Sequence, residues 1–98
     1  MQTHGLKIVA RNFRVRGGEI DLIAEDGRTL VFVEVRLRSS QSFGGAAASI
    51  TARKQERVIL AARHWLQAHG ERDCRFDCVL FDALSANNLE WIKGAFSA

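Results

Sequence analysis

Apolar residues recur at every second position along three segments in the first part of the chain, which is the spacing of half-buried β-strands. The segments cover residues 6–15, 19–25 and 28–37, and the alternation is imperfect around Arg11 and Asn12. A Gly17-Gly18 pair separates the first two segments. An Asp26-Gly27 pair separates the last two and is typical of a tight hairpin turn. Three consecutive strands are therefore predicted, and the second and third form a hairpin.

A helical pattern follows. Thr51 is suited to the N-cap, and Gly70 is suited to end a helix after His69. Between them the apolar residues form one stripe at helical spacing: Val58, Ile59, Ala62, Trp65 and Leu66. The opposite side of the helix carries Arg53, Arg57, His64 and Gln67. The pattern predicts an amphipathic helix that packs its apolar stripe on the sheet.

Two more strands are predicted after the helix, over residues 75–82 and 89–92, with a turn at Asn87-Asn88. The resulting order, β-β-β-α-β-β, is typical of the α/β or the α+β class with a mostly mixed sheet, and we favour α/β. We expect a single domain over residues 1–98 in which a central mixed β-sheet of about five strands has one long helix packed on one face. We expect Asp77 to be structural and paired with a nearby arginine.

Composition narrows the class of protein. With 47% hydrophobic and 26% charged residues, the 98-residue chain is expected to be globular. The net charge of +3 and pI of about 9.4 permit a polyanionic partner. No apolar run approaches the roughly 20 residues of a membrane span, and no basic-then-apolar leader opens the chain, so no membrane association is expected. Cys74 and Cys78 lie roughly 13 Å apart on a strand, too far for a disulfide. We expect buried free thiols and a cytoplasmic protein.

The hairpin brings acidic residues together. With a two-residue turn at Asp26-Gly27, the residue numbers of each pair of facing residues add up to 53. Asp21 and Glu34 are then diagonal neighbours on one face of the hairpin. That face carries Glu19, Asp21, Ile23, Leu30, Phe32, Glu34 and Arg36. The other is wholly apolar and carries Ile20, Leu22, Ala24, Val31, Val33, Val35 and Leu37.

Glu34 lies in a run, Leu-Val-Phe-Val-Glu-Val-Arg-Leu, with the composition of a central strand covered on both faces. A carboxylate is costly there unless it is paired or bound to a metal. Asp21 and Glu34 could share one hard cation such as Mg²⁺, with Glu19 as a further oxygen donor. The alternative is a solvated sheet face on which Arg36 is the counter-charge.

Residues 18–23 (Gly-Glu-Ile-Asp-Leu-Ile) and 31–36 (Val-Phe-Val-Glu-Val-Arg) resemble the YraN-like family of small uncharacterised bacterial proteins. By its motif that family belongs to the restriction-endonuclease-like PD-(D/E)XK superfamily and is similar to archaeal Holliday junction resolvases. The resemblance covers nearly the whole chain from about Gly5. It includes residues 11–14, 43–45, 51–57 and 75–77.

The resemblance implies a restriction-endonuclease-like core and a metal-dependent endonuclease acting on DNA, rather than RNA, with branched DNA as one expected substrate. Asp21, Glu34 and the carbonyl of Val35 would hold one Mg²⁺ or Mn²⁺ ion. The motif lysine falls on Arg36, which can stabilise charge on the phosphate but cannot act as a base. The motif proline is replaced by Ile20. Junction enzymes of this kind usually work as dimers, so a homodimer is expected.

The first turn of the helix supplies two further catalytic candidates, Lys54 and Gln55. They flank the apolar stripe and can reach the sheet, where the superfamily resemblance places a polar helix residue near the scissile phosphate. The alternative is a helix end at which Lys54 extends its ammonium to solvent. The candidates for nucleic-acid backbone contact are Arg14, Arg16, Arg38, Arg53 and Arg57, with Arg11 beside them. Plain solubility is the other explanation for these exposed cations.

Three functions remain open at this point. They are a metal-dependent nuclease, a catalytically weakened nucleic-acid-binding module, and a non-enzymatic interaction protein whose acidic face binds a cation. YraN-like chains generally begin with a helix ahead of the segment that starts at Gly5. Only residues 1–4 precede it here, so the N-terminal helix is expected to be absent. We expect either a mis-assigned start or self-association that covers the exposed face.

Overall fold

Five strands and one α-helix form the part of the chain that the computed structural model describes, residues 5–38, 50–82 and 85–98. The side chains of residues 38 and 82–88 are outside that description. The elements are β1 (Lys7–Val15), β2 (Gly18–Asp26), β3 (Thr29–Arg38), α2 (Ala52–His69), β4 (Cys74–Asp82) and β5 (Ser85–Phe96). Residues 1–4, on which the expectation about an N-terminal helix rests, lie outside the described ranges.

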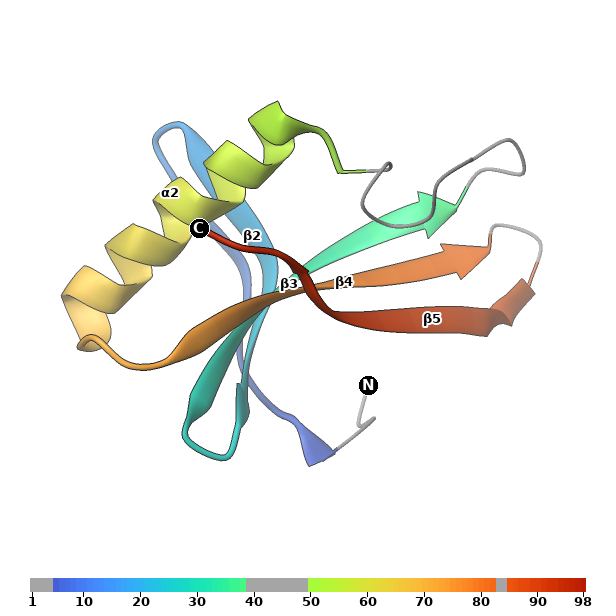
Figure 1. Ribbon diagram of the computed structural model, residues 1–98, viewed down its shortest axis with the longest axis horizontal. Coiled ribbons are helices and arrows are strands. Elements are labelled where there is room, and N and C mark those ends of the chain that lie inside the picture. Colours follow the sequence, from blue (N-terminus) through green and yellow to red (C-terminus); the bar gives the residue numbers. More distant parts are fainter. Residues whose placement is uncertain (1–4, 39–49, 83–84) are drawn as a thin grey trace.

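The strands form one twisted sheet in the order β1-β2-β3-β4-β5, with α2 on one of its faces (Figure 1). The pairs β1–β2, β2–β3 and β4–β5 are antiparallel, whereas β3 and β4 are parallel. A parallel pair needs a crossover between its strands, and α2 lies in that connection. The predicted α/β class, with a mixed sheet of five strands and one helix on it, is confirmed, and β3 is its central strand.

The predicted register of the β2–β3 hairpin was wrong by one pair. Asp26 pairs with Thr29 and Leu22 with Val33, so partners sum to 55 and the two loop residues are Gly27 and Arg28. Gly27 has a φ of 61°, and Arg28 has no positive φ. A tight turn with positive φ only at its first central position favours glycine there, which moves the turn one residue along the chain. A register shift of this kind does not by itself move residues between faces, and it brings Asp21 closer to Glu34.

Hydrophobic clusters cover both faces of the sheet. The cluster under α2 contains Ile20, Ile23, Leu30, Phe32, Val58, Ala61, Ala62, Leu66 and Phe76. The cluster on the opposite face contains Ala24, Val31, Val33 and Val79, with Leu22, Val35 and Trp91 against it. The central strand is therefore buried on both sides, as its composition predicted.

One residue of the predicted apolar face is on the other side. Ile20 and Ile23 both pack under the helix, although they are three positions apart, while Leu22 packs on the opposite face. A regular strand alternates faces at every residue, so β2 must break its alternation between Ile20 and Leu22. Asp21 is the residue at that break.

The helix has the predicted ends. The Thr51 hydroxyl accepts a hydrogen bond from the Lys54 amide at 3.1 Å, and the Gly70 amide donates to the Leu66 carbonyl at 2.7 Å. Between Arg57 and Ala61 the helix lies very close to β2. A Cβ built on Gly18 would lie 2.4 Å from the Arg57 carbonyl oxygen, so only glycine permits this approach.

Two smaller predictions were wrong. The proposed turn at Asn87-Asn88 falls inside β5, because β4 and β5 stay paired from Asp82–Ser85 onward. Cys78 is a buried free thiol, but Cys74 is exposed because it begins β4, outside the core. In the described ranges, no helix is long and apolar enough to cross a membrane.

Candidate metal and phosphate site

Asp21 and Glu34 meet at the point where β2 and β3 stop pairing. The last recorded backbone pair is Leu22–Val33, and one further step along this register places Asp21 opposite Glu34. The Val35 amide donates instead to Asp21 Oδ2, at 2.9 Å. The Asp21 carboxylate therefore occupies the place of a backbone acceptor, and the two strands separate beside it.

Glu34 is buried at this opening. Its exposed fraction is 1%, and Lys54 Nζ from the first turn of α2 lies 3.0 Å from its Oε2. Its other oxygen, Oε1, is buried and has no hydrogen-bond partner among the described residues. A buried carboxylate oxygen without a donor is costly, and a cation bound to it would remove that cost.

The surroundings of Glu34 and Lys54 perturb both groups. Burial and, next, the neighbouring Asp21 carboxylate raise the pKa of Glu34, Lys54 opposes them, and the net result is a pKa of about 7. Partial burial lowers the pKa of Lys54, but Glu34 and Glu19 outweigh this effect and raise that pKa overall. Near neutral pH, Lys54 is thus charged, while Glu34 is present in both its protonated and its ionised form.

Glu19 gathers basic side chains next to this pair. Its Oε1 lies 3.5 Å from Lys54 Nζ and 3.4 Å from Arg57 Nη2, and its Oε2 lies 3.9 Å from Arg14 Nε. Arg14 comes from β1 and Arg57 from α2, and both remain largely exposed. Glu19 therefore holds three cations, Arg14, Lys54 and Arg57, beside Glu34, and we call them the basic rim. That Glu19 also donates an oxygen to a metal ion stays a prediction.

The donors present suit a hard divalent cation. In the described part of the chain, no cluster of three or more His, Cys, Asp and Glu side chains is placed to hold a metal. Mg²⁺, however, is commonly held by one or two carboxylates, with water and substrate phosphate oxygens completing its shell. Asp21 and the unpartnered oxygen of Glu34 match such a site, and the Val35 carbonyl would be the third protein donor.

The other predicted site residues lie around this centre. Arg36 is half-buried, two residues beyond Glu34 on the same strand. The Gln55 side chain donates through Nε2 to the Ile50 carbonyl at 3.1 Å, which fixes the start of the helix. Arg16 and Arg53 are exposed. Arg38 ends β3, and its side chain is outside the described set.

Asp77 has the predicted structural role. It is fully buried and accepts hydrogen bonds from Arg75 Nε at 3.1 Å, Trp91 Nε1 at 2.8 Å and the Gly94 amide at 3.0 Å. Arg75 also binds Asp26, at 2.9 Å. The network joins β4 to β5 and to the hairpin. Both oxygens of the Asp77 carboxylate thus accept hydrogen bonds, two contacts each, so they are engaged within the protein and not available to a metal.

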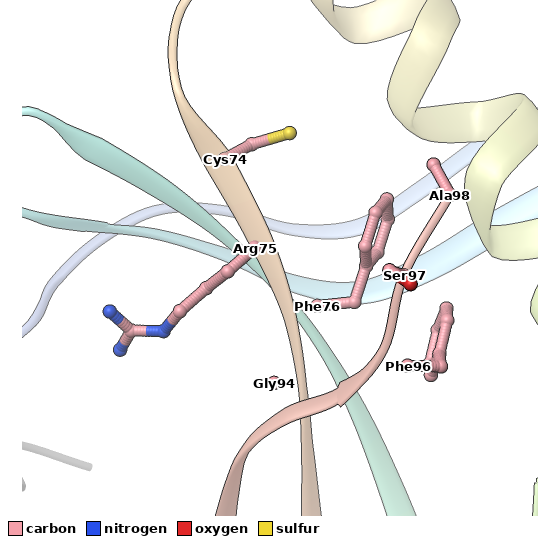
Figure 2. Close-up of a pocket in the computed structure, with 7 residues that line it drawn as sticks. All are labelled: Cys74, Arg75, Phe76, Gly94, Phe96, Ser97 and Ala98. Atoms are coloured by element: carbon pink, nitrogen blue, oxygen red, sulfur yellow. The ribbon is translucent and has the colours of Figure 1, made fainter.

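Two pockets on the described surface differ in their chemistry. The first, of about 350 Å³, lies where the ends of β4 and β5 meet. Figure 2 shows that Phe76 and Phe96 face it, while the Arg75 guanidinium points to the other side of β4. Its lining includes neither Asp21 nor Glu34. The second, of about 400 Å³, includes Asp21 and Val35.

Sequence reasoning missed part of the second pocket. Asn12 and Phe81 line it, with Arg11, Asp21, Leu22 and Val35. The available signal for Asn12 was the imperfect alternation at Arg11-Asn12, which marks a local break in β1. Phe81 carried no such signal, because an aromatic residue in a strand is ordinarily part of the core.

Comparison with known proteins gives a consistent family match. A model of the uncharacterised protein family UPF0102 matches residues 1–81. A UPF0102 protein from Dechloromonas aromatica is 61% identical over 98 residues, which cover 100% of this chain and 79% of that protein. A UPF0102 protein from Methylobacillus flagellatus is 56% identical over 94 residues, covering 96% of this chain and 83% of the relative. A third, from Nitrosomonas europaea, is 55% identical over 97 residues, covering 98% and 82%.

Proposed function

The chain belongs to the uncharacterised protein family UPF0102, and we propose that it is a divalent-metal-dependent endonuclease that hydrolyses DNA phosphodiester bonds at the Asp21–Glu34 site. Membership agrees with the resemblance to the YraN-like family. The relatives' names assign no activity, so the proposal rests on the site itself. The observation that supports it most strongly is the buried Glu34, with one oxygen on Lys54 and the other unpartnered within the described structure, beside a second carboxylate.

A restriction-endonuclease-like core is part of this proposal. The hairpin presents one acidic residue on each strand, and the crossover helix presents a lysine to the second of them. This order of parts, with an Asp, then Glu-Val-Arg, then the helix residue, is what the superfamily motif requires, except for the proline and the motif lysine. The comparison of site parts, rather than the fold class alone, is the reason for the assignment.

Asp21, Glu34 and the Val35 carbonyl would hold the cation. Such an ion lowers the pKa of a bound water and stabilises charge that develops on the phosphate during in-line attack. Glu34 must be ionised to act as a ligand, so the site gains its donor as the pH rises through about 7.

Lys54 supplies the fixed positive charge that the motif lysine would supply elsewhere. Its raised pKa keeps the ammonium protonated, so it acts as an electrostatic partner of the phosphate and not as a base. Arg36 adds a second cation that cannot be deprotonated. The water must therefore lose its proton to a group other than these two.

The basic rim suits the DNA backbone. Arg14 and Arg57 flank Glu19 beside the acidic pair, and Arg16 and Arg53 are exposed nearby in the sequence. Arginine contacts to phosphate position a nucleic acid without reading its sequence, and they weaken as salt rises. We therefore expect binding with strong salt dependence and weak sequence preference.

A second candidate function follows from Arg36, which stands where the motif has lysine. A nucleic-acid-binding module with little or no turnover would keep the cation site and the basic rim. Activity that appears only in the Arg36→Lys variant would support this candidate, because that change restores the motif and leaves the charge unaltered.

Cleavage assays test the proposal. Labelled four-way junctions, three-way junctions, duplexes, single strands and RNA are incubated with the protein and Mg²⁺ or Mn²⁺. The wild type should cut at least one DNA substrate, and Asp21→Asn and Glu34→Gln, purified identically, should not. Cleavage that survives in both variants would show a contaminant or another site. Metal binding without any cleavage by the wild type would favour the binding module.

A further inference from the structure

A second pocket surface extends from the acidic pair to the face of the sheet opposite α2. Its lining crosses four neighbouring strands: Arg11 and Asn12 come from β1, Asp21 and Leu22 from β2, Val35 from β3 and Phe81 from β4. Leu22 and Val35 belong to the hydrophobic cluster on that face. Asp21 is therefore reached from this pocket, while Glu34 meets Lys54 on the helix side.

The pocket forms where two strands lose their regular alternation. Consecutive strand residues normally point to opposite faces, yet Arg11 and Asn12 both line it, as do Asp21 and Leu22. Asn12 has a φ of 53°, the positive φ that asparagine tolerates better than most residues. The recorded pairs on either side, Arg11–Leu22 and Phe13–Ile20, share one register, which places Asn12 opposite Asp21.

The lining has the chemistry of a nucleotide site. Arg11 is an exposed guanidinium, which binds phosphate as a fork of donors. The Asn12 amide offers both a donor and an acceptor. Phe81 is half-buried in the wall, and an aromatic ring is a surface on which an unpaired base stacks. The volume, about 400 Å³, is near the lower end of small-molecule sites and suits one nucleotide better than a base pair.

We propose that this pocket binds one unpaired nucleotide of a DNA strand, with its base against Phe81 and its phosphate on Arg11. The position of this nucleotide next to the cleaved bond rests on the proposed function, because Asp21 belongs both to the pocket lining and to the proposed metal site. The substrate class is then DNA with an unstacked nucleotide, as in a single strand, a flap or a junction, since a paired base is held inside the duplex stack.

Binding without metal tests the pocket directly. Fluorescence anisotropy in EDTA would measure the affinity for three labelled DNAs of one sequence: a single strand, a duplex with one bulged nucleotide and a blunt duplex. The variants are Phe81→Leu, Arg11→Gln and, as a control, Arg16→Gln. Arg16 is an exposed cation that follows the same strand and does not line the pocket.

Phe81→Leu should weaken binding of the single strand and the bulged duplex about 10-fold, from the loss of base stacking, and leave the blunt duplex unchanged. Arg11→Gln should weaken the first two more than Arg16→Gln does, whereas Arg16→Gln should affect all three DNAs alike. Equal losses on the blunt duplex, or losses no larger than those of Arg16→Gln, would overturn the proposal.

A second variant keeps the test decisive if Phe81→Leu unfolds. Phe81→Trp retains an aromatic wall, so it should bind the single strand like the wild type, and its added indole fluorescence should be quenched by the single strand but not by the blunt duplex. Quenching equal for both DNAs, or absent for both, contradicts the pocket assignment. Because EDTA removes metal, a failure of metal binding contradicts the proposed function without affecting this result.

Discussion

Replacing Glu34 with glutamine should remove a pH-dependent penalty from the folded protein. The side chain is 1% exposed, and its pKa of about 7 exceeds the ordinary value of 4.5. A difference of about 2.5 pKa units corresponds to about 3 kcal/mol at roughly 1.4 kcal/mol per unit. Glutamine keeps the size and shape of the side chain and cannot ionise.

The sign follows from which state binds the proton more tightly. The folded state holds the Glu34 proton up to about pH 7, whereas the unfolded state releases it near pH 4.5. The resulting stabilisation is full below pH 4.5 and is lost as the pH rises through about 7. The Glu34→Gln variant should therefore gain about 3 kcal/mol relative to the wild type between pH 4.5 and pH 8.

Urea unfolding in EDTA measures this difference. The free energy of unfolding is determined at intervals from pH 4.5 to pH 8 for the wild type, for Glu34→Gln and for Glu56→Gln, a control in which an exposed glutamate on α2 is changed. The control should differ from the wild type by a constant amount. If the difference between the wild type and Glu34→Gln is also constant across this range, the reasoning about the buried carboxyl is wrong.

Three further variants test the Lys54–Glu34 ion pair, the hydrogen-bond network of Asp77 and the close approach of the helix at Gly18. Lys54→Met should raise the pKa of Glu34 above about 7, so the free energy of unfolding should change with pH around a higher midpoint. The same variant should cleave DNA about 10²-fold more slowly. An unchanged midpoint would contradict the ion pair between Lys54 and Glu34. Asp77→Asn should lower the free energy of unfolding by about 3 kcal/mol in urea titrations, because it breaks a buried charged network. Gly18→Ala should lower the free energy of unfolding by about 2–3 kcal/mol in the same titration, because the added Cβ would meet the Arg57 carbonyl oxygen. A loss below about 0.5 kcal/mol, as for an ordinary surface change, would refute the close approach of the helix to β2.

Much of the architecture could be predicted because it depends on local patterns. The strand alternation, the Thr51 cap and the Gly70 stop each follow from a few neighbouring residues, and the structure has them. The hairpin register was off by one pair because the choice between Asp26-Gly27 and Gly27-Arg28 depends on which turn position takes positive φ. Both turns suit the composition, so the sequence pattern alone did not separate them.

The proximity of Asp21 and Glu34 was predictable, because any hairpin turn with an even number of loop residues places these two residues on one face. The break in β2 at Asp21 was not predictable. It moves Ile20 under the helix and follows from the separation of β2 from β3, which is a tertiary event with no local signature. The sequence predicted that Lys54 can reach the sheet, but not that it pairs with Glu34. The distance between these two side chains depends on how closely the helix approaches the sheet at Gly18.

The proposed function depends on Asp21 and Glu34 forming a site for one divalent cation. Calorimetric titration with Mn²⁺ and with Mg²⁺ at pH 8, where Glu34 is ionised, tests it on the wild type, Asp21→Ala, Glu34→Gln and the Glu56→Gln control. We expect one ion to bind per chain of the wild type and of the control, and no ion to bind to the two site variants. Absence of binding by the wild type, or unchanged binding in both site variants, would contradict the proposed site.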